Sequence, residues 1–315
     1  MLARKAVAVL RSRSDRPRNR WGPPVQHGLT TPRAGSDAAR CSVVIRKAAV
    51  AGSWYPGSAG SLARAVDDCL EFARESEPGL GSITAIVAPH AGLMYSGRVA
   101  AYAYRALQGQ AFDLALLVGP SHFVAFGGVA TAGSAGFETP LGVVVVDEEC
   151  EAALADALPG LRPYPVAHAR EHSLEMQLPF LQRVAPSAKI VALLMGHQTA
   201  ETSRSLGEAL AAVVRGRRVV LVASTDLSHY HDARTAVALD AVVVDHIARM
   251  DAAGLQRTLE TRPDHACGGG PTVAVLRAAR LLGAERAAIL RYGDSGDVSG
   301  DKSSVVGYVA AAIGL

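Results

Sequence analysis

The sequence lacks the features that mark membrane-spanning, disulfide-stabilised and nucleotide-binding proteins. No stretch of about 18 apolar residues without charge occurs, so we expect no transmembrane helix. The four cysteines (Cys41, Cys69, Cys150 and Cys267) are widely spaced and form no CxxC pair, which argues against a disulfide framework. GxGxxG and GxxxxGK(S/T) loops are missing, as are a GxSxG elbow and an HExxH helix. Dinucleotide binding, P-loop nucleotide binding and hydrolysis by a serine elbow therefore lose support.

Charge is distributed unevenly along the 315 residues. Residues 1–46 carry ten basic and two acidic side chains, a net charge of +8, so residues 47–315 have a net charge of −5 within the overall +3. Prolines and the lack of periodicity predict that residues 1–46 form a basic, disordered tail, either a transit peptide or the product of an upstream translation start. Because the basic charge lies in this tail, we expect no nucleic-acid binding by the domain at residues 47–315. We also expect this domain to be cytoplasmic and to bind no membrane.

Strand-like and helical patterns alternate from Lys47 to the C-terminus. Short β-branched runs predict strands, and apolar residues at helical spacing predict helices between them. This alternation is typical of a sheet covered on both faces, so we predict one α/β domain with a central, mainly parallel mixed sheet flanked by helices. The expected strands are Ile83–Pro89, Leu114–Gly119, Ile190–Met195, Val219–Ser224, Ala287–Tyr292 and Val305–Ala311, and the expected helices are Gly97–Leu107, Glu148–Leu158, Ser173–Val184, Ala200–Val214, Thr235–Met250, Ala252–Glu260 and Thr272–Leu282.

Two further local patterns predict structure. Gly128–Thr131 and Val143–Val146 are expected to form a β-hairpin-like insertion. Ser173, flanked by Glu171 and Glu175, is typical of a capped helix start.

Polar residues directly follow three of the expected strands. His90 follows the first strand, His122 the second, and Asp226 with His229 the fourth. Ligands of open α/β sheets bind beyond the carboxyl ends of the strands, so these side chains are expected to meet at one site. Asp226 is either a site residue that orients His229 or binds substrate, or the N-cap of a helix.

Cys267 belongs to a CGGGP sequence, residues 267–271, just before an expected helix. The positive end of a helix favours a thiolate, and the glycines allow another backbone or a ligand to approach closely. The alternative is a buried small apolar residue. Together with the imidazoles of His90 and His122, a thiolate would suit Fe(II), Zn or Cu and would leave coordination positions open. His229 would then act as an acid or base.

Six motifs together resemble those of the Memo family, also called AmmeMemoRadiSam system protein B. They occur in the family's order within residues 47–315, and only the basic tail lies outside the resemblance. The motifs are Ala51-Gly52-Ser53-Trp54-Tyr55-Pro56, Ala88-Pro89-His90-Ala91-Gly92, Gly119-Pro120-Ser121-His122, Glu171-His172-Ser173-Leu174-Glu175-Met176, Ser224-Thr225-Asp226-Leu227-Ser228-His229 and Cys267-Gly268.

The resemblance implies a fold similar to that of the class III extradiol dioxygenases. It implies metal ligation by His90, His122 and Cys267, with iron(II) as the expected metal and copper or zinc as alternatives. It also implies that the catalytic residues are His229 and Asp226 and that the substrate pocket is lined by Trp54, Tyr95 and His172. A helix-start role for His172 is the alternative.

One departure limits the analogy with the dioxygenases. They complete their iron site with a carboxylate, whereas Cys267 would supply a softer thiolate, so ring-cleavage chemistry does not follow directly. The leading hypothesis is a metal-dependent oxidoreductase acting on an unidentified small molecule. A non-catalytic protein that binds a peptide or partner in the same cleft, and a Cys267–His hydrolase without metal, are the alternatives. The family name also implies AMMECR-type and radical-SAM proteins as partners.

Overall fold

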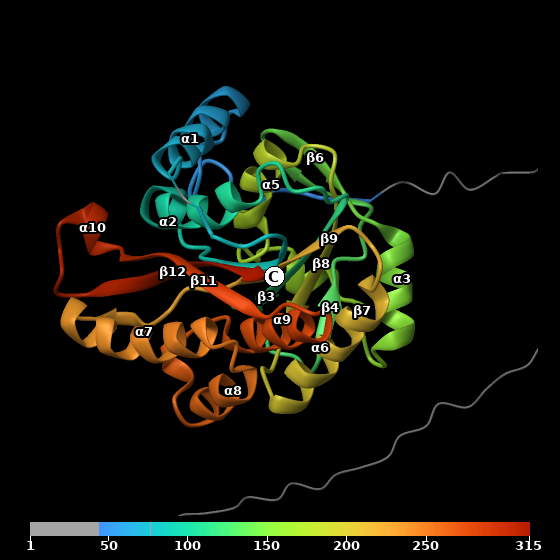
Figure 1. Cartoon of the computed structure of the whole chain (residues 1–315). Helices are drawn as coiled ribbons and strands as arrows, with labels where there is room; N and C mark the ends of the chain where they lie inside the picture. The colour runs from blue at the N-terminus through green and yellow to red at the C-terminus, as the bar shows by residue number, and fades with distance from the viewer. Residues whose placement is uncertain (1–43, 76) are drawn as a thin grey trace, which may run out of the picture. The chain divides into compact units, whose positions relative to one another are not determined.

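Four parallel strands form the centre of the main sheet (Figure 1). They run in the order β2 (Ile83–Ala88), β9 (Val219–Ser224), β3 (Leu114–Pro120) and β8 (Lys189–Met195). Alternate residues of each strand enter two separate cores, as Ile86 and Val87 of β2 do. Parallel strands buried on both faces need nearly continuous apolar runs, which is why the sequence identifies all four.

The computed structural model describes residues 44–75 and 77–315, and these belong to one compact unit. The expected basic tail lies outside the described residues except at its end. There, strand β1 (Ile45–Arg46) pairs with β5 (Gly136–Thr139), so the described fold begins before the expected boundary at Lys47.

Antiparallel strands form both margins of the main sheet. On one side, β12 (Val305–Gly314) pairs with β2, and both β11 (Arg286–Asp294) and β10 (His229–His231) pair with β12. On the other side, β4 (Val129–Thr131) pairs with β8 and with β7 (Arg162–Pro163). The prediction of an α/β domain with a mixed sheet is confirmed, with the parallel pairs concentrated at its centre.

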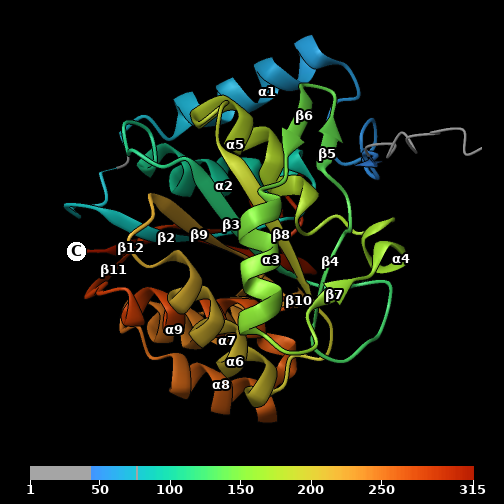
Figure 2. The ribbon, with the colours of Figure 1, turned by 90° about the vertical axis from the view of Figure 1, so that its right-hand side faces the viewer.

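Helices cover both faces of the sheet (Figure 2). One side carries α1 (Ala59–Phe72), α2 (Leu93–Ala106) and α5 (Leu178–Val184), and the other carries α6 (Ala200–Val214), α7 (Ala233–Ala248), α8 (Ala252–Thr261) and α9 (Gly269–Leu281). Helix α3 (Glu148–Ala157) packs beside α6, and α4 (Pro165–His168) and α10 (Gly296–Ser299) are short. Within residues 44–75 and 77–315, none of the helices combines the length and apolar character needed to cross a bilayer.

The expected hairpin of Gly128–Thr131 with Val143–Val146 is wrong. β4 joins the main sheet, whereas β6 (Gly142–Val145) pairs with β5. The turn between them is short, and Gly142 adopts a φ of 119°, which favours glycine. Strand β6, which contains the valine run, therefore pairs with β5 and not with β4, because closing a short loop costs less conformational entropy than closing a long one.

The expected cap at Ser173 is also wrong. Its hydroxyl donates to the Pro120 carbonyl, 2.9 Å away, and the helical segment starts later, with a 3₁₀ turn at Glu175–Gln177 that leads into α5. Glu175 is completely buried, so it cannot be a solvated first-turn acid. Long-range polar contacts have overridden the local capping pattern.

Glu175 fixes the start of the described chain. Its carboxylate forms a buried ion pair with Arg46 and accepts hydrogen bonds from the backbone N–H groups of Ala49 and Val50 and from the Tyr55 hydroxyl. Arg46 also donates to main-chain carbonyls of the segment that leads to Glu175. One carboxylate therefore holds the loop that precedes α1.

We expect Arg46→Met to lower the free energy of unfolding by about 3 kcal/mol, because it leaves the Glu175 charge buried without its cation. Chemical denaturation measures the change. The matched control is Arg183→Met, which breaks an exposed pair with Asp67 and should cost less than about 1 kcal/mol. Equal, small losses in both variants would contradict this account of Glu175.

Candidate metal centre

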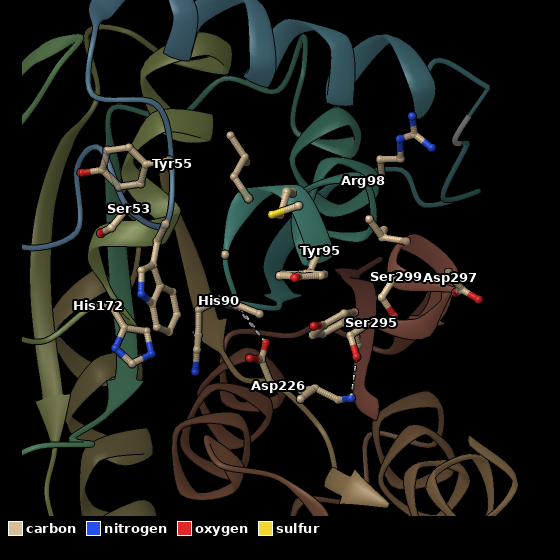
Figure 3. A pocket seen from close by; sticks show the side chains of 18 of the residues that line it. Ser53, Tyr55, His90, Tyr95, Arg98, His172, Asp226, Ser295, Asp297 and Ser299 are labelled. Atoms are coloured by element: carbon tan, nitrogen blue, oxygen red, sulfur yellow. Dashed lines mark hydrogen bonds between the residues drawn. The ribbon is translucent and has the colours of Figure 1, made fainter. Parts of the chain in front are cut away.

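The carboxyl ends of β2, β3 and β9 meet at one cavity, part of which is shown in Figure 3. Each strand delivers a polar residue two positions beyond its last residue: His90 after β2, His122 after β3 and Asp226 after β9. Parallel neighbours end at the same edge, so residues distant in sequence become neighbours in space. The strand-end pattern read from the sequence therefore gives the observed convergence.

Three candidate metal-binding atoms cluster at this edge. One ligand atom each from His90, His122 and Cys267 lies within 4.8 Å of the other two. The His90 Nε2 and Cys267 Sγ atoms are 3.2 Å apart. His90 is buried, whereas the side chain of His122 is 26% exposed, so the group lies at the cavity wall and a ligand from the cavity has access to it.

Hydrogen bonds set the tautomer of His90. The Ser224 hydroxyl donates its only proton to the Ser173 carbonyl (2.6 Å) and accepts from the Gln177 amide (2.7 Å). The His90 Nδ1 atom, 2.9 Å from the same hydroxyl oxygen, must then carry a proton and donate it. His90 Nε2 is left with its lone pair directed at Cys267, as a metal ligand requires.

A carboxylate sets the tautomer of His122 in the same way. Glu171 accepts from His122 Nδ1 at 2.9 Å and from the His122 backbone N–H at 2.6 Å. Burial works to raise the pKa of Glu171, but these bonds and one from the Ser173 backbone lower it to about 2. Glu171 is therefore an acceptor only, and the lone pair of His122 is on Nε2.

The backbone around Cys267 is pressed against the end of β9. The Cys267 N–H donates to the Asp226 carbonyl (3.2 Å), and the Gly268 N–H donates to the Thr225 hydroxyl (3.0 Å). A Cβ atom on Gly268 would lie 2.2 Å from the Ser224 carbonyl oxygen. The close approach expected from the glycines is therefore observed at Gly268, and it places the thiol beside His90.

The donor set fits a metal cation. Burial lowers the pKa of His90 well below its usual value, and neighbouring imidazoles, His122 first, lower it further. Burial raises the pKa of Cys267, and the nearby Asp226 carboxyl adds to the effect. Without a cation the expected thiolate is therefore not favoured, whereas a bound divalent ion would replace the thiol proton and satisfy the lone pairs of both imidazoles.

Asp226 lines the cavity and is not a helix cap, because strand β10 follows it and the next helix is capped by Asp232. Its carboxylate accepts from the backbone N–H groups of His90 (2.8 Å) and Ala91 (3.3 Å). Burial raises the pKa of Asp226 to about 7, although these two bonds act in the opposite direction. His229 lines the same cavity, and burial lowers its pKa.

The residues expected to line a pocket do so. Trp54, Tyr95 and His172 all lie along this cavity. The His172 ring is stacked on that of His122 with centroids 4.5 Å apart, and its centroid lies 4.1 Å from that of Trp54. Burial lowers the pKa of His172 to about 4, so it is neutral, and its buried Nδ1 makes no hydrogen bond within the described residues.

Comparison with known proteins identifies the family. The family model of Memo-like proteins matches residues 46–312. Two similar relatives are MEMO1 family proteins, one from Nitrosopumilus maritimus at 36% identity and one from Methanosarcina mazei at 40%; each alignment covers 85% of this chain, with 98% and 99% of the respective relative. The chain belongs to the Memo family.

A solved structure is also similar to this Memo-family chain. It is the crystal structure of an uncharacterized protein from Escherichia coli K12, with a TM-score of 0.45 and 17% identity, and the match covers 73% of this chain and 99% of that one. This level of similarity supports no inference about the site.

Sequence reasoning missed three residues of this Memo-family site. The local pattern places Glu171 only at a helix start and indicates no role for Ser224 or Gln177. Two local features could have indicated Glu171 and Ser224: Glu171 directly precedes His172, and Ser224 is the last residue of strand β9. No such feature indicates Gln177, because its contact with Ser224 joins positions 47 residues apart in the chain.

We expect Glu171→Gln to weaken metal affinity by about 10- to 100-fold, the usual effect of removing a partner that orients a histidine ligand. An amide cannot accept at both ends, so His122 would lose its fixed tautomer. Anaerobic competition with a chromophoric chelator measures the affinity, with the exposed Glu149→Gln on α3 as control. Equal affinities for the two variants would contradict the role of Glu171.

Proposed function

We propose that this Memo-family protein is a non-haem, metal-dependent oxidoreductase acting on an oxygen-bearing small molecule, with iron(II) as the metal. The supporting observation is the convergence of two oriented imidazole lone pairs and a thiol at the cavity wall. Three protein ligands leave positions for other molecules, the pattern of catalytic and not structural metal sites. A cytoplasmic location belongs to the same proposal.

The imidazole and thiolate donors are compatible with iron, and also with copper or zinc. Imidazole and thiolate bind all three metals, and a thiolate donates more electron density than the carboxylate of the extradiol dioxygenases. A redox-active metal held by His90, His122 and Cys267 would supply electron transfer and dioxygen chemistry. Zinc would restrict the site to Lewis-acid chemistry.

The neighbouring residues would bind the substrate and move protons. The lowered pKa of His229 keeps its imidazole neutral near pH 7, so it can accept a proton from a substrate hydroxyl. Asp226 is held by two backbone N–H groups and titrates near neutrality, which suits an acid or base. His172 lines the same cavity, where its ring would contact the substrate.

Two other functions receive less support. A Cys267–His90 hydrolase would need His90 to take the thiol proton, but burial disfavours both the imidazolium and the thiolate. A non-catalytic role in binding a peptide or a partner, such as an AMMECR-type or radical-SAM protein, would use the same cavity. Stoichiometric metal without dioxygen consumption on any substrate would favour that role.

Dioxygen uptake by the iron-loaded protein with a panel of catechol-like compounds tests the proposal. We expect uptake to be lost in His90→Ala, His122→Ala and Cys267→Ala. In His229→Gln, metal should be retained but turnover should fall by about 10²- to 10⁴-fold, the usual contribution of a general acid or base. His246→Gln, which changes a histidine paired with Asp251 away from the cavity, should behave like the wild type. Turnover unaffected by loss of the three ligands would refute the proposal.

A further inference from the structure

The cavity is much larger than a single-ring substrate needs. Its volume is about 1450 Å³, whereas small-molecule sites usually measure about 300–1,000 Å³. It extends from His90 past Tyr95 to Ser295 and Ser299, at the turn that contains α10 (Figure 3). A molecule the size of catechol bound at the metal centre would leave most of this space filled with water.

Three exposed aromatic side chains line the cavity, each from a different segment. Trp54 (36% exposed) lies in the loop held by Glu175, Tyr95 (38%) on α2 and Tyr230 (78%) in β10. The Trp54 carbonyl also accepts from the Leu93 N–H at the start of α2, so the Trp54 loop is fixed to the same helix as Tyr95. Rigid rings that face an open cavity are preformed surfaces for a flat ligand.

The backbone at Tyr230 is strained. Its φ is +63°, and among the described residues only Met250 is another non-glycine residue with a positive φ. The pairing of β10 with β12 shifts register between His229 and His231, so Tyr230 is bulged. In a regular strand His229 and Tyr230 would point to opposite faces, but here both line the cavity. Strain of this kind persists where the surrounding structure enforces it, and it often marks a functional position.

Polar groups near α10 are already engaged. Asp297 pairs with Lys302, and the Asp301 carboxylate accepts from the backbone N–H and hydroxyl of Ser303. Two charged side chains, Arg98 and Asp68, also line the cavity, and the Arg98 guanidinium lies over the Phe72 ring. The exposed aromatic faces supply flat apolar surface between the metal centre and the far end of the cavity, so ring stacking is available to a ligand along this length.

We propose that the substrate is an extended, flat, multi-ring phenol, whose oxygen-bearing head reaches the metal centre and whose further rings lie between Trp54, Tyr95 and Tyr230. The placement of the head rests on the proposed function. The placement of the body rests on the shape and aromatic walls of the cavity. Tyr230 is the specificity-determining residue, because the bulge directs its ring to this wall.

Anaerobic calorimetry with the zinc-loaded protein tests this inference without turnover. The probes are catechol, which supplies only the head, and quercetin, a flavonol in which the same catechol head is joined to a flat body of two fused rings. We expect quercetin to bind at least about tenfold more tightly than catechol, the gain of one or two stacking contacts. Tyr230→Gly should remove most of this preference, and Tyr230→Phe, which keeps the ring, should retain it.

Thermal unfolding separates recognition from damage to the fold. Tyr230→Gly should have a Tm equal to or above that of Tyr230→Phe, because glycine relieves the positive φ. Equal affinity for the two probes, or a quercetin preference unchanged in Tyr230→Gly, would overturn the inference. Failure to bind zinc would count against the proposed function instead, whereas zinc binding with catechol and quercetin equally tight would count against this inference alone.

Discussion

The candidate metal centre depends on the buried polar segment from Glu171 to Gln177. Glu171 sets the tautomer of His122, and Gln177 and the Ser173 carbonyl set the Ser224 hydroxyl that in turn sets His90. The same segment contains Glu175, which holds the loop carrying Trp54. A buried donor or acceptor without a partner costs about 1–3 kcal/mol, so breaking one of these hydrogen bonds would leave its neighbours in the network unsatisfied as well.

This arrangement explains how two imidazoles and a thiol can lie side by side at the cavity wall. The outer atoms of the imidazoles are satisfied by the protein, and the inner atoms, His90 Nε2, His122 Nε2 and Cys267 Sγ, converge. A divalent metal would complete such a set, and the softness of a thiolate ligand would separate this site from one closed by a carboxylate.

The sequence predicted the parallel strands and the convergence of His90, His122 and Asp226 because both follow from local rules: apolar runs form buried strands, and residues after parallel strands share an edge. It failed where long-range contacts decide the outcome. The Ser173 hydroxyl donates to the Pro120 carbonyl instead of capping a helix. The valine run of β6 pairs with the adjacent strand β5 instead of with the more distant Gly128–Thr131 segment. The role of Gln177 depends on its contact with Ser224, and the bulge at Tyr230 depends on the pairing of β10 with β12. Both contacts join distant parts of the chain, so no local sequence pattern predicts them.

Anaerobic metal analysis of the purified protein beside a Cys267→Ala variant tests the central claim most directly. Cys69→Ala is the matched control, since Cys69 lines the same cavity but does not belong to the cluster of candidate ligands. The account predicts near-stoichiometric iron or copper in the wild type and in Cys69→Ala, and its loss in Cys267→Ala. Wild-type protein that is free of metal and refuses added Fe(II) and copper, or a Cys267→Ala variant that retains metal at the wild-type level, would contradict it.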